Sequence, residues 1–280
     1  MLAQTYTPLE IIVIDSSPTE HTAKLIQIQF PQIKVIYSPV QLLPHAARNR
    51  GVAESTGELL LFTDPDIYAL SNWVETLVAA YQAKRGIIAG SVACYGHKWI
   101  DRSIHLSKFD LWLPGGRARR ITMAPTANLL CDRHTFETVG PFKDDMNGDT
   151  VWCWAASRLG IPLWMEPKAR VEHHHLSTIS NFIRERFPRG YEFAELRSKY
   201  ENWSYLRIVL YALLTLVVPL GLARVMGRIL TEAVRAGLLW DFIAGFPVIL
   251  MGQAAWLAGE TTALLRNLAK RFIVRPNHHS

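Results

Sequence analysis

The sequence predicts an α/β fold in which helices flank a sheet, followed by a pair of apolar C-terminal helices embedded in a membrane. Short apolar runs rich in β-branched residues alternate with helical segments, and two long uncharged segments follow later in the chain. The 280 residues are 49% hydrophobic and 19% charged, which excludes a fibrous or disordered protein. This length suits one large α/β domain with an appendage.

The expected strands lie where β-branched and other apolar residues cluster, at residues 9–14, 33–37, 59–62 and 87–92. The expected helices between them cover residues 22–29, 46–53 and 71–83. Ser71 is a favourable N-cap for the last helix, and apolar residues from Trp73 to Tyr81 form one stripe along it. Because helices separate the strands, we expect the strands to run parallel.

The pattern is less regular beyond residue 92. Residues 94–120 are mixed and basic, which predicts an irregular segment that includes a glycine-rich basic loop at 115–120. This loop is interpreted as a flexible, solvated basic loop, and attraction of a lipid phosphate is the alternative. The pair Leu159-Gly160 is typical of a helix end, and residues 162–165 predict a late strand.

The C-terminal part of the chain has the composition of a membrane segment. Basic and aromatic residues mingle over 184–207, as expected at a lipid headgroup interface. Residues 208–223 and 242–259 carry no charge and would measure roughly 24 and 27 Å as helices, slightly less than the bilayer core. Two buried helices of a soluble domain are the alternative, but residues 209–218 have no polar face, which favours the membrane.

A hairpin with both ends in the cytoplasm is the first interpretation of these two segments. Re-entrant or interfacial helices, favoured by Pro219 and Pro247, are the second. We therefore expect three parts: an α/β domain over residues 1–180, an interfacial segment over 181–207, and two membrane helices with a basic tail over 208–280.

The net charge and the cysteine content limit the kinds of partner and of site that we expect for this protein. The formal charge of +6 suits an anionic partner. The basic and aromatic residues cluster beside the lipid-like segments, so a nucleic-acid binder is not expected. Three cysteines without C-x-x-C spacing imply neither a disulfide framework nor a thiolate zinc site. Since no secretory signal is visible at the start, we expect the catalytic domain to face the cytoplasm.

Acidic residues follow two of the expected strands. Asp15 ends the first strand and precedes a small polar turn, where ligands bind in open parallel sheets. Asp15 is therefore a candidate acceptor for a base or sugar group, and a turn-capping acid is the alternative. Asp64 and Asp66 follow the third strand, separated by Pro65. Such paired carboxylates suit Mg²⁺ or Mn²⁺, which in turn neutralises a diphosphate.

The order of these motifs resembles that of the family 2 glycosyltransferases, inverting enzymes with the GT-A nucleotide-sugar fold. The resemblance covers residues 2–180 and rests on segments 2–6, 10–15, 47–51, 55–58, 62–66, 139–142, 148–150 and 167–173. It implies that Asp15 contacts the nucleobase, that Asp64 lies on the ribose or diphosphate side, and that Asp66 holds the metal. It also places Arg48 among the residues that bind the nucleotide sugar.

The resemblance implies that Asp149 is the general base. The family usually has Glu-Asp where this chain has Gly148-Asp149, so the acidic pair is reduced to one carboxylate. One carboxylate suffices to take a proton from an acceptor hydroxyl. A solvated acid or helix N-cap before Val151 is the alternative interpretation of Asp149.

Three consecutive histidines at 173–175 invite a metal interpretation. In an extended segment His173 and His175 share one face and His174 points to the other, so at most two of them join one site. In the resemblance, His173 takes the place of a histidine near the diphosphate, and we predict it as a metal ligand. A structural role for all three is the alternative.

The family's first strand has no counterpart before Leu9. We expect either that the chain start lies too far downstream or that the sheet lacks a central strand and has unpaired edges.

The sequence thus predicts a membrane-anchored, metal-dependent inverting glycosyltransferase. Its donor would be a UDP- or GDP-linked sugar, and its acceptor a hydroxyl of a lipid-linked or other membrane-proximal saccharide. A non-catalytic module that keeps the fold for binding or assembly is the alternative.

Overall fold

The computed structural model describes residues 1–145, 147–175, 178–216 and 218–273, which form two compact units. Unit 1 contains Met1–Ala93 and Pro114–His174, and unit 2 contains Cys94–Leu113 and the residues from His175 onward. The functional boundaries expected at residues 180 and 207 remain a prediction.

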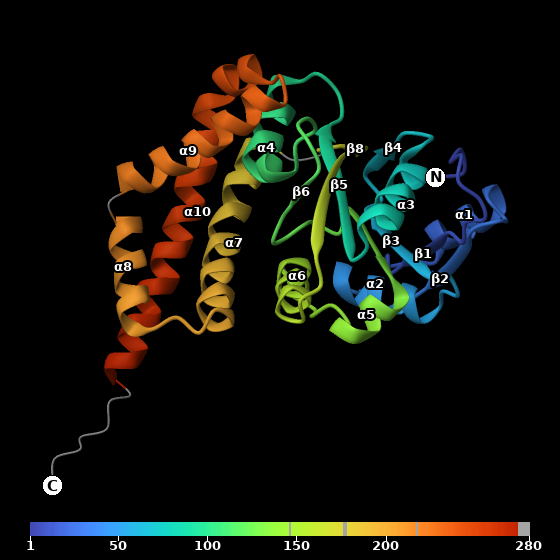
Figure 1. The fold of residues 1–280 in the computed structure, drawn as a ribbon, viewed down its shortest axis with the longest axis horizontal. Coiled ribbons are helices and arrows are strands. Elements are labelled where there is room, and N and C mark those ends of the chain that lie inside the picture. Colours follow the sequence, from blue (N-terminus) through green and yellow to red (C-terminus); the bar gives the residue numbers. More distant parts are fainter. Residues whose placement is uncertain (146, 176–177, 217, 274–280) are drawn as a thin grey trace, which may run out of the picture. The chain divides into compact units, whose positions relative to one another are not determined.

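Unit 1 is built on two sheets (Figure 1). The smaller sheet pairs β1 (Ile12–Asp15) with β2 (Lys34–Tyr37) in parallel. The larger sheet has the order β3-β7-β5-β8-β4, with β6 also paired to β8. Its strands are β3 (Leu59–Thr63), β4 (Ile67–Ala69), β5 (Ile87–Cys94), β6 (Arg119–Arg120), β7 (Asn128–Asp132) and β8 (Leu163–His173).

The expectation of parallel strands is correct for β1 and β2 but not for the pairs that β7, β4 and β6 form in the larger sheet. β7 lies between β3 and β5 and runs antiparallel to both, and β4 and β6 run antiparallel to β8. The α/β class is confirmed, with a mixed sheet in place of a parallel one. The reason is that β7, a five-residue strand not expected from the sequence, lies between β3 and β5.

The helices of unit 1 are α1 (His21–Gln29), α2 (Pro44–Ala53), α3 (Trp73–Lys84), α5 (Arg133–Val139) and α6 (Gly148–Arg158). Of these, α1 and α2 contact the smaller sheet, whereas α3 and α5 contact the larger one. The N-cap of α3 is Asn72, one residue beyond the expected Ser71. Phe62 of β3, Leu129 of β7, Phe136 of α5 and Trp152 of α6 share one core cluster. This cluster fixes the start of α6 and the end of β3 in one framework.

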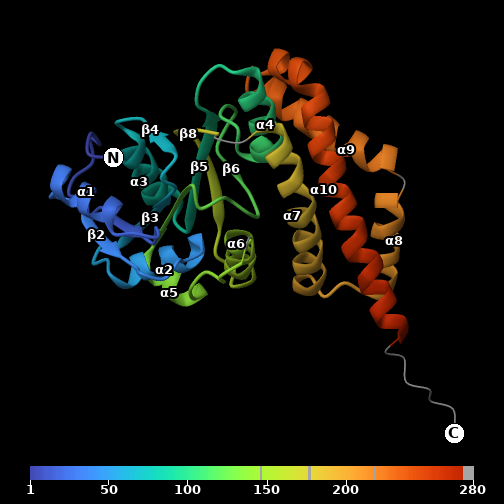
Figure 2. The ribbon, with the colours of Figure 1, turned by 180° about the vertical axis from the view of Figure 1, so that it is seen from behind.

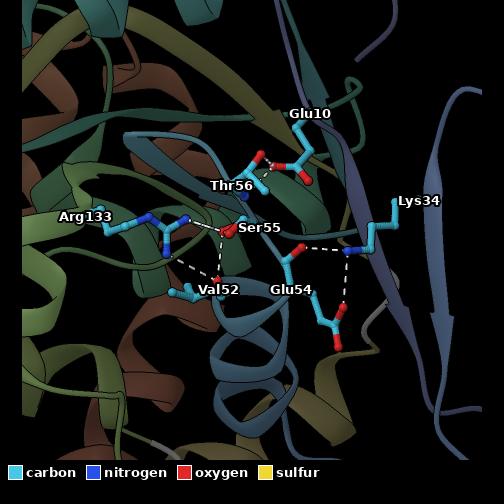
Figure 3. Close-up of polar contacts among 7 residues, drawn as sticks. All are labelled: Glu10, Lys34, Val52, Glu54, Ser55, Thr56 and Arg133. Atoms are coloured by element: carbon cyan, nitrogen blue, oxygen red, sulfur yellow. Dashed lines mark hydrogen bonds and ion pairs between the residues drawn. The ribbon is translucent and has the colours of Figure 1, made fainter.

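The segment between α2 and β3 ties the two sheets together (Figure 3). Thr56 donates from its backbone N and its Oγ1 to the carboxylate of Glu10, at 2.8 and 3.2 Å. Lys34 of β2 donates to the carbonyl oxygen of Glu54 at 2.6 Å and pairs with its carboxylate at 3.1 Å. From the other side, the guanidinium of Arg133 donates to the carbonyl oxygens of Val52, Ser55 and Gly57, at 3.5, 2.9 and 3.1 Å. Side-chain bonds therefore tie the segment between α2 and β3 to Glu10 just before β1, to Lys34 of β2 and to Arg133 of α5.

Unit 2 is helical. It contains α4 (Trp99–Phe109), a short 3-10 helix (Asp110–Trp112), α7 (Ile179–Tyr200), α8 (Tyr205–Leu216), α9 (Val218–Arg235) and α10 (Leu239–Ile273). Figures 1 and 2 both show α7 and α10 side by side. Glycines at 190 and 259 allow the two backbones to approach closely. A Cβ at Gly190 would lie 2.2 Å from the carbonyl oxygen of Trp256, and one at Gly259 would lie 2.1 Å from that of Phe187.

The prediction of two membrane helices is wrong. In the described part of the chain, only α10 is long and apolar enough to cross a bilayer, over Leu239–Lys270, in which an 18-residue window has a mean hydropathy of 1.6. The first apolar segment, 208–223, is divided between α8 and α9, and residue 217 lies outside the described residues. The 12 residues of α8 measure only about 18 Å, well short of a bilayer core.

The expectation of an irregular segment over 94–120 is also wrong in part. Residues 99–109 form α4, whose Ile104 and Leu106 are fully buried. Packing against α10 in the same unit supplies the apolar surface that stabilises this helix. Arg119 and Arg120 form β6, and the guanidinium of Arg120 lies 4.4 Å from the centroid of the Trp164 ring. The basic loop is therefore partly a strand.

Candidate active site

The acidic pair after β3 lies beside the end of β8. Ile67, the first residue of β4, pairs with His173, the last residue of β8, and this register sets Asp66 next to the imidazole. His173 Nε2 is 3.5 Å from Asp66 Oδ2, and the backbone N of His174 donates to the carbonyl oxygen of Asp66 at 2.9 Å. The strand register thus joins residues that are more than a hundred positions apart.

Asp64, Asp66 and His173 have the composition of a divalent-cation site. Each offers one ligand atom, and the three atoms lie within 4.8 Å of one another. Their side chains are 26%, 37% and 13% exposed, so a ligand reaches them from solvent. Carboxylate oxygens and an imidazole nitrogen suit Mn²⁺, and the carboxylates also suit Mg²⁺. The residues present therefore fit the metal that the sequence predicts.

Arg48 of α2 adds positive charge to this group. Its Nη2 forms an ion pair with Asp64, and the Arg48 side chain is only 14% exposed. The Nε of Arg48 is buried and has no hydrogen-bond partner among the residues that the structure describes. Asn49, the next residue, bonds to the backbone of Phe142 in both directions, at 2.8 and 2.9 Å. The helix that carries Arg48 is therefore anchored, and one donor remains available to an anion.

His45 connects Arg48 to the first turn of α6. The His45 Nδ1 lies 3.4 Å from Arg48 Nη1, and its ring is in contact with Gly148. Burial lowers the pKa of His45, and the negative charge of Asp149 opposes that effect only in part. His45 is therefore neutral near pH 7. This residue was not among the predicted site residues, and the only local signal for it is its position at the start of α2.

Asp149 lies in the first turn of α6, a position compatible with both interpretations of this residue, a general base and an acid at a helix N-terminus. Its Oδ2 accepts from the backbone N of Thr126 at 3.3 Å, and its Oδ1 accepts from the backbone N of Thr150 at 2.7 Å. The side chain is half-buried. Through His45 and Arg48, Asp149 belongs to the same network of neighbouring polar groups as Asp64.

Gly148 occupies a position where no side chain fits. A Cβ there would lie 2.2 Å from the carbonyl oxygen of Lys143 and 2.6 Å from Cδ2 of His45. The space that an acidic side chain would need is filled by the backbone and by the imidazole. Steric exclusion of a side chain at position 148 therefore explains why this pair carries only one carboxylate, that of Asp149.

Asp15 lies at the end of β1 in the smaller sheet, apart from the sheet that carries Asp64 and His173. It is 8% exposed, and its Oδ1 accepts from the backbone N and the Oγ of Ser17 at 3.0 and 2.6 Å. Burial opposes ionisation of Asp15, but the hydrogen bonds from Ser17 outweigh it, so its pKa lies below the ordinary value. Its Oδ2 is buried and makes no hydrogen bond of normal geometry to the described residues.

The three histidines diverge. His173 joins the acidic pair, the ring of His174 lies 6.3 Å from that of Tyr68, and His175 is buried in unit 2 beside His105. Because β8 ends at His173, the alternation expected for an extended segment does not continue to His175.

Comparison with known proteins gives one family. Residues 1–137 match the family model described as glycosyl transferase family 2. Over 162 residues, the chain is 26% identical to a pre-mycofactocin glycosyltransferase of Mycobacterium tuberculosis, covering 54% of this chain and 34% of that protein. Over 170 residues it is 25% identical to glycosyltransferase AglE of Haloferax volcanii, covering 58% of this chain and 56% of that protein. The chain thus spans only about a third to just over half of these relatives.

Among solved structures, the mannosyltransferase PcManGT from Pyrobaculum calidifontis, in complex with GDP-Man and Mn²⁺, is similar in fold. The TM-score is 0.53 at 15% identity, covering 98% of this chain and 75% of that chain. This likeness supports the GT-A type of fold.

Proposed function

We propose that the chain, whose residues 1–137 match the family model described as glycosyl transferase family 2, transfers a sugar from a UDP- or GDP-linked donor to a hydroxyl of a lipid-linked or saccharide acceptor. The observation that carries the proposal is the grouping of Asp64, Asp66 and His173 beside the guanidinium of Arg48. Oxygen and nitrogen ligands for a cation, next to a fixed positive charge, form a site suited to a diphosphate.

In this proposal Asp66 and His173 hold Mg²⁺ or Mn²⁺. When bound, the ion neutralises charge on the diphosphate leaving group. Arg48 orients Asp64 through their ion pair, and its buried Nε is a further donor for a phosphate oxygen. Asp15 Oδ2 is the acceptor for a nucleobase N–H, because Asp15 is ionised and this oxygen makes no hydrogen bond of normal geometry within the described part of the chain.

Asp149 is the general base of the proposal. Its carboxylate takes the proton of the acceptor hydroxyl while the hydroxyl oxygen forms a bond to the anomeric carbon. The bond from that carbon to the diphosphate breaks on the opposite face, and the nucleoside diphosphate leaves with the electron pair. The anomeric configuration is therefore inverted. Backbone donors at Thr126 and Thr150 fix the carboxylate in place.

The test compares Asp66→Asn and Asp149→Asn with a matched control, Asp144→Asn, an exposed acid near the same loop. Purified full-length protein is incubated with UDP- and GDP-linked hexoses, Mn²⁺ and a membrane lipid extract, and UDP or GDP release is measured. We expect Asp149→Asn to lower turnover at least about 100-fold, the usual scale for loss of a general base, and to leave nucleotide binding unchanged.

For Asp66→Asn we expect loss of the Mn²⁺-dependent part of UDP or GDP binding in calorimetry, while Asp144→Asn keeps wild-type behaviour. Equal turnover in Asp66→Asn and wild type would refute the metal assignment. Nucleotide binding without turnover, in wild type as in the variants, would instead favour a non-catalytic module.

We further propose that unit 2 binds the membrane surface. In α8 the exposed residues Leu206, Leu210 and Leu213 recur at helical spacing along one face. In α10 the exposed Trp240 and Ile243 add an aromatic and apolar edge, and Arg224 of α9 is exposed as well. An exposed apolar face beside basic residues is typical of interfacial helices.

The neighbour of α10 favours an interfacial position over a spanning one. Its partner α7 runs close along it and is rich in charged residues, from Arg184 to Lys199. If α10 crossed the bilayer, these charges would lie at membrane depth, which is costly. The described cysteines form no disulfide, which suits the cytoplasmic face of the membrane.

Vesicle flotation tests this proposal with Leu210→Glu and, as control, Ile28→Glu, which changes a 79% exposed residue of α1. We expect Leu210→Glu to weaken binding to phosphatidylcholine–phosphatidylserine vesicles about tenfold, because burying a leucine is worth about 1.5–3 kcal/mol. Ile28→Glu should bind like wild type. Equal binding by both variants would refute the surface. Resistance to alkaline carbonate extraction would refute the interfacial position and favour a span.

A further inference from the structure

Unit 2 contains a second group of metal-ligand side chains that the proposed reaction does not use. Cys94 ends β5, His105 lies in the middle of α4, and His175 follows β8. Each offers one ligand atom, and the three atoms lie within 4.8 Å of one another. The two histidines are 1% and 5% exposed, and Cys94 is half-buried. The group is therefore almost closed to bulk water.

The two imidazole rings are in contact, with centroids 5.1 Å apart and planes at 66°. His105 Nδ1 and His175 Nε2 are 2.9 Å apart, a distance at which one ring nitrogen donates a hydrogen bond to the other. In a tetrahedral zinc site with Zn–N distances of about 2.0–2.1 Å, two nitrogen ligands lie roughly 3.3 Å apart. A shift of a few tenths of an ångström therefore converts this pair into two metal ligands.

Cys94 supplies a soft third ligand. Its thiol donates to the carbonyl oxygen of Tyr95 at 3.6 Å, a weak hydrogen bond that a metal–thiolate bond readily replaces. Sulfur and imidazole nitrogen select zinc and similar borderline ions, whereas the carboxylates at Asp64 and Asp66 select harder ions such as Mg²⁺. The two groups therefore differ in the metal they prefer.

Aromatic packing holds the histidines in this arrangement. The ring of Phe109 stacks on His105, with centroids 5.1 Å apart and planes at 18°, and lies 5.9 Å from the ring of His175. Fixed ligand orientation and an apolar surround are features of protein metal sites. Rotation of either imidazole away from the other would disturb this packing.

We propose that Cys94, His105 and His175 form a zinc site, with a fourth position for water. Cys94 and His175 are the first residues of the two segments that make up unit 2, so the ion joins the start of each segment to α4. Its role is therefore structural, and the site is independent of the proposed transferase reaction. The ligands are separated by 10 and 69 intervening residues, a spacing that no sequence motif reveals.

Cobalt substitution tests the site. Chelator-treated full-length protein is titrated with Co²⁺ in excess Mg²⁺, which occupies the oxygen-rich site. We expect one Co²⁺ with tetrahedral absorption bands and a thiolate-to-cobalt charge-transfer band, displaced by Zn²⁺. Cys94→Ser should remove the charge-transfer band, and His175→Ala should weaken binding at least tenfold. The control His174→Ala, a change in the adjacent residue, should leave both unchanged.

A labelling experiment uses the wild type alone, so it does not depend on folding of a variant. Bound Zn²⁺ should slow alkylation of Cys94 by iodoacetamide at least tenfold relative to protein with EDTA. Equal labelling rates with and without Zn²⁺, or absence of the charge-transfer band from the wild type, would overturn the proposal. Co²⁺ affinity of His175→Ala equal to that of wild type would do the same.

Discussion

Replacement of Gly148 by alanine is expected to destabilise the protein, although the same change in an ordinary helix stabilises it. Gly148 is the first residue of α6, and alanine in a helix is worth about 0.5–1 kcal/mol relative to glycine. The structure reverses this sign. A Cβ would lie 2.2 Å from the backbone oxygen of Lys143 and 2.6 Å from the ring of His45, so both must move.

The size of the effect follows from these two contacts. Overpacking a closely packed site typically costs about 1–3 kcal/mol, and the helix gain offsets only part of it, so we expect about 1–2 kcal/mol of net destabilisation. The start of α6 must shift to relieve the backbone contact, and Asp149 shifts with it. A misplacement of about 1 Å at a reacting group costs roughly 100-fold in rate.

Urea unfolding followed by tryptophan fluorescence measures the stability change, and turnover of the accepted nucleotide sugar measures the displacement. Gly51→Ala in α2 is the matched control, because its Cβ would meet only Ile14 Cγ1 at an ordinary 3.7 Å. The double variant His45→Ala/Gly148→Ala should recover only part of the loss, since the Lys143 carbonyl remains. A Gly148→Ala protein as stable and as active as wild type would refute the reasoning.

Three further predictions concern pH, the link between the sheets and a buried thiol. Burial keeps the pKa of His45 low despite the charge of Asp149, so the unfolded chain binds more protons than the folded one below about pH 6.5. The urea midpoint of wild-type unfolding should therefore fall as the pH drops through that value. In His45→Gln the midpoint should depend less on pH, and an equal pH dependence in both proteins would contradict this. Arg133→Ala should lose about 2–4 kcal/mol of unfolding free energy in urea, because the guanidinium of Arg133 donates to three carbonyl oxygens, two of which, those of Val52 and Ser55, belong to residues drawn in Figure 3. A loss below about 0.5 kcal/mol would contradict this role. Burial raises the pKa of Cys153 to about 12, so iodoacetamide at pH 8 should label it far more slowly in folded than in urea-unfolded protein; equal rates would disprove its burial.

Local sequence patterns predicted the elements whose stability is local. The apolar runs that became β1, β2, β3 and β5 and the helices α1 to α3 carry their own periodicity and turn signals. β7 was not predicted, because it is short and begins with Asn128. That side chain is buried only because its amide donates to the carbonyls of Ser91 and Ala169 and accepts from Trp73 Nε1, all distant in sequence.

The site divides in the same way. Asp64 and Asp66 are neighbours in the chain, so their pairing was predictable, whereas the approach of His173 depends on the register of β4 with β8. The contact of His45 with Gly148 joins residues about a hundred positions apart, and no pattern near either one announces it. The prediction of one membrane helix over residues 208–223 was wrong, because composition does not show where one helix ends and another begins.

The most direct test of the proposed site is a crystal structure of the protein with Mn²⁺ and UDP or GDP, with anomalous diffraction recorded at the manganese edge. We expect one strong anomalous peak in contact with Asp66 and His173, with the diphosphate beside Arg48. A manganese peak elsewhere, or a nucleotide bound away from these residues, would contradict the proposed function.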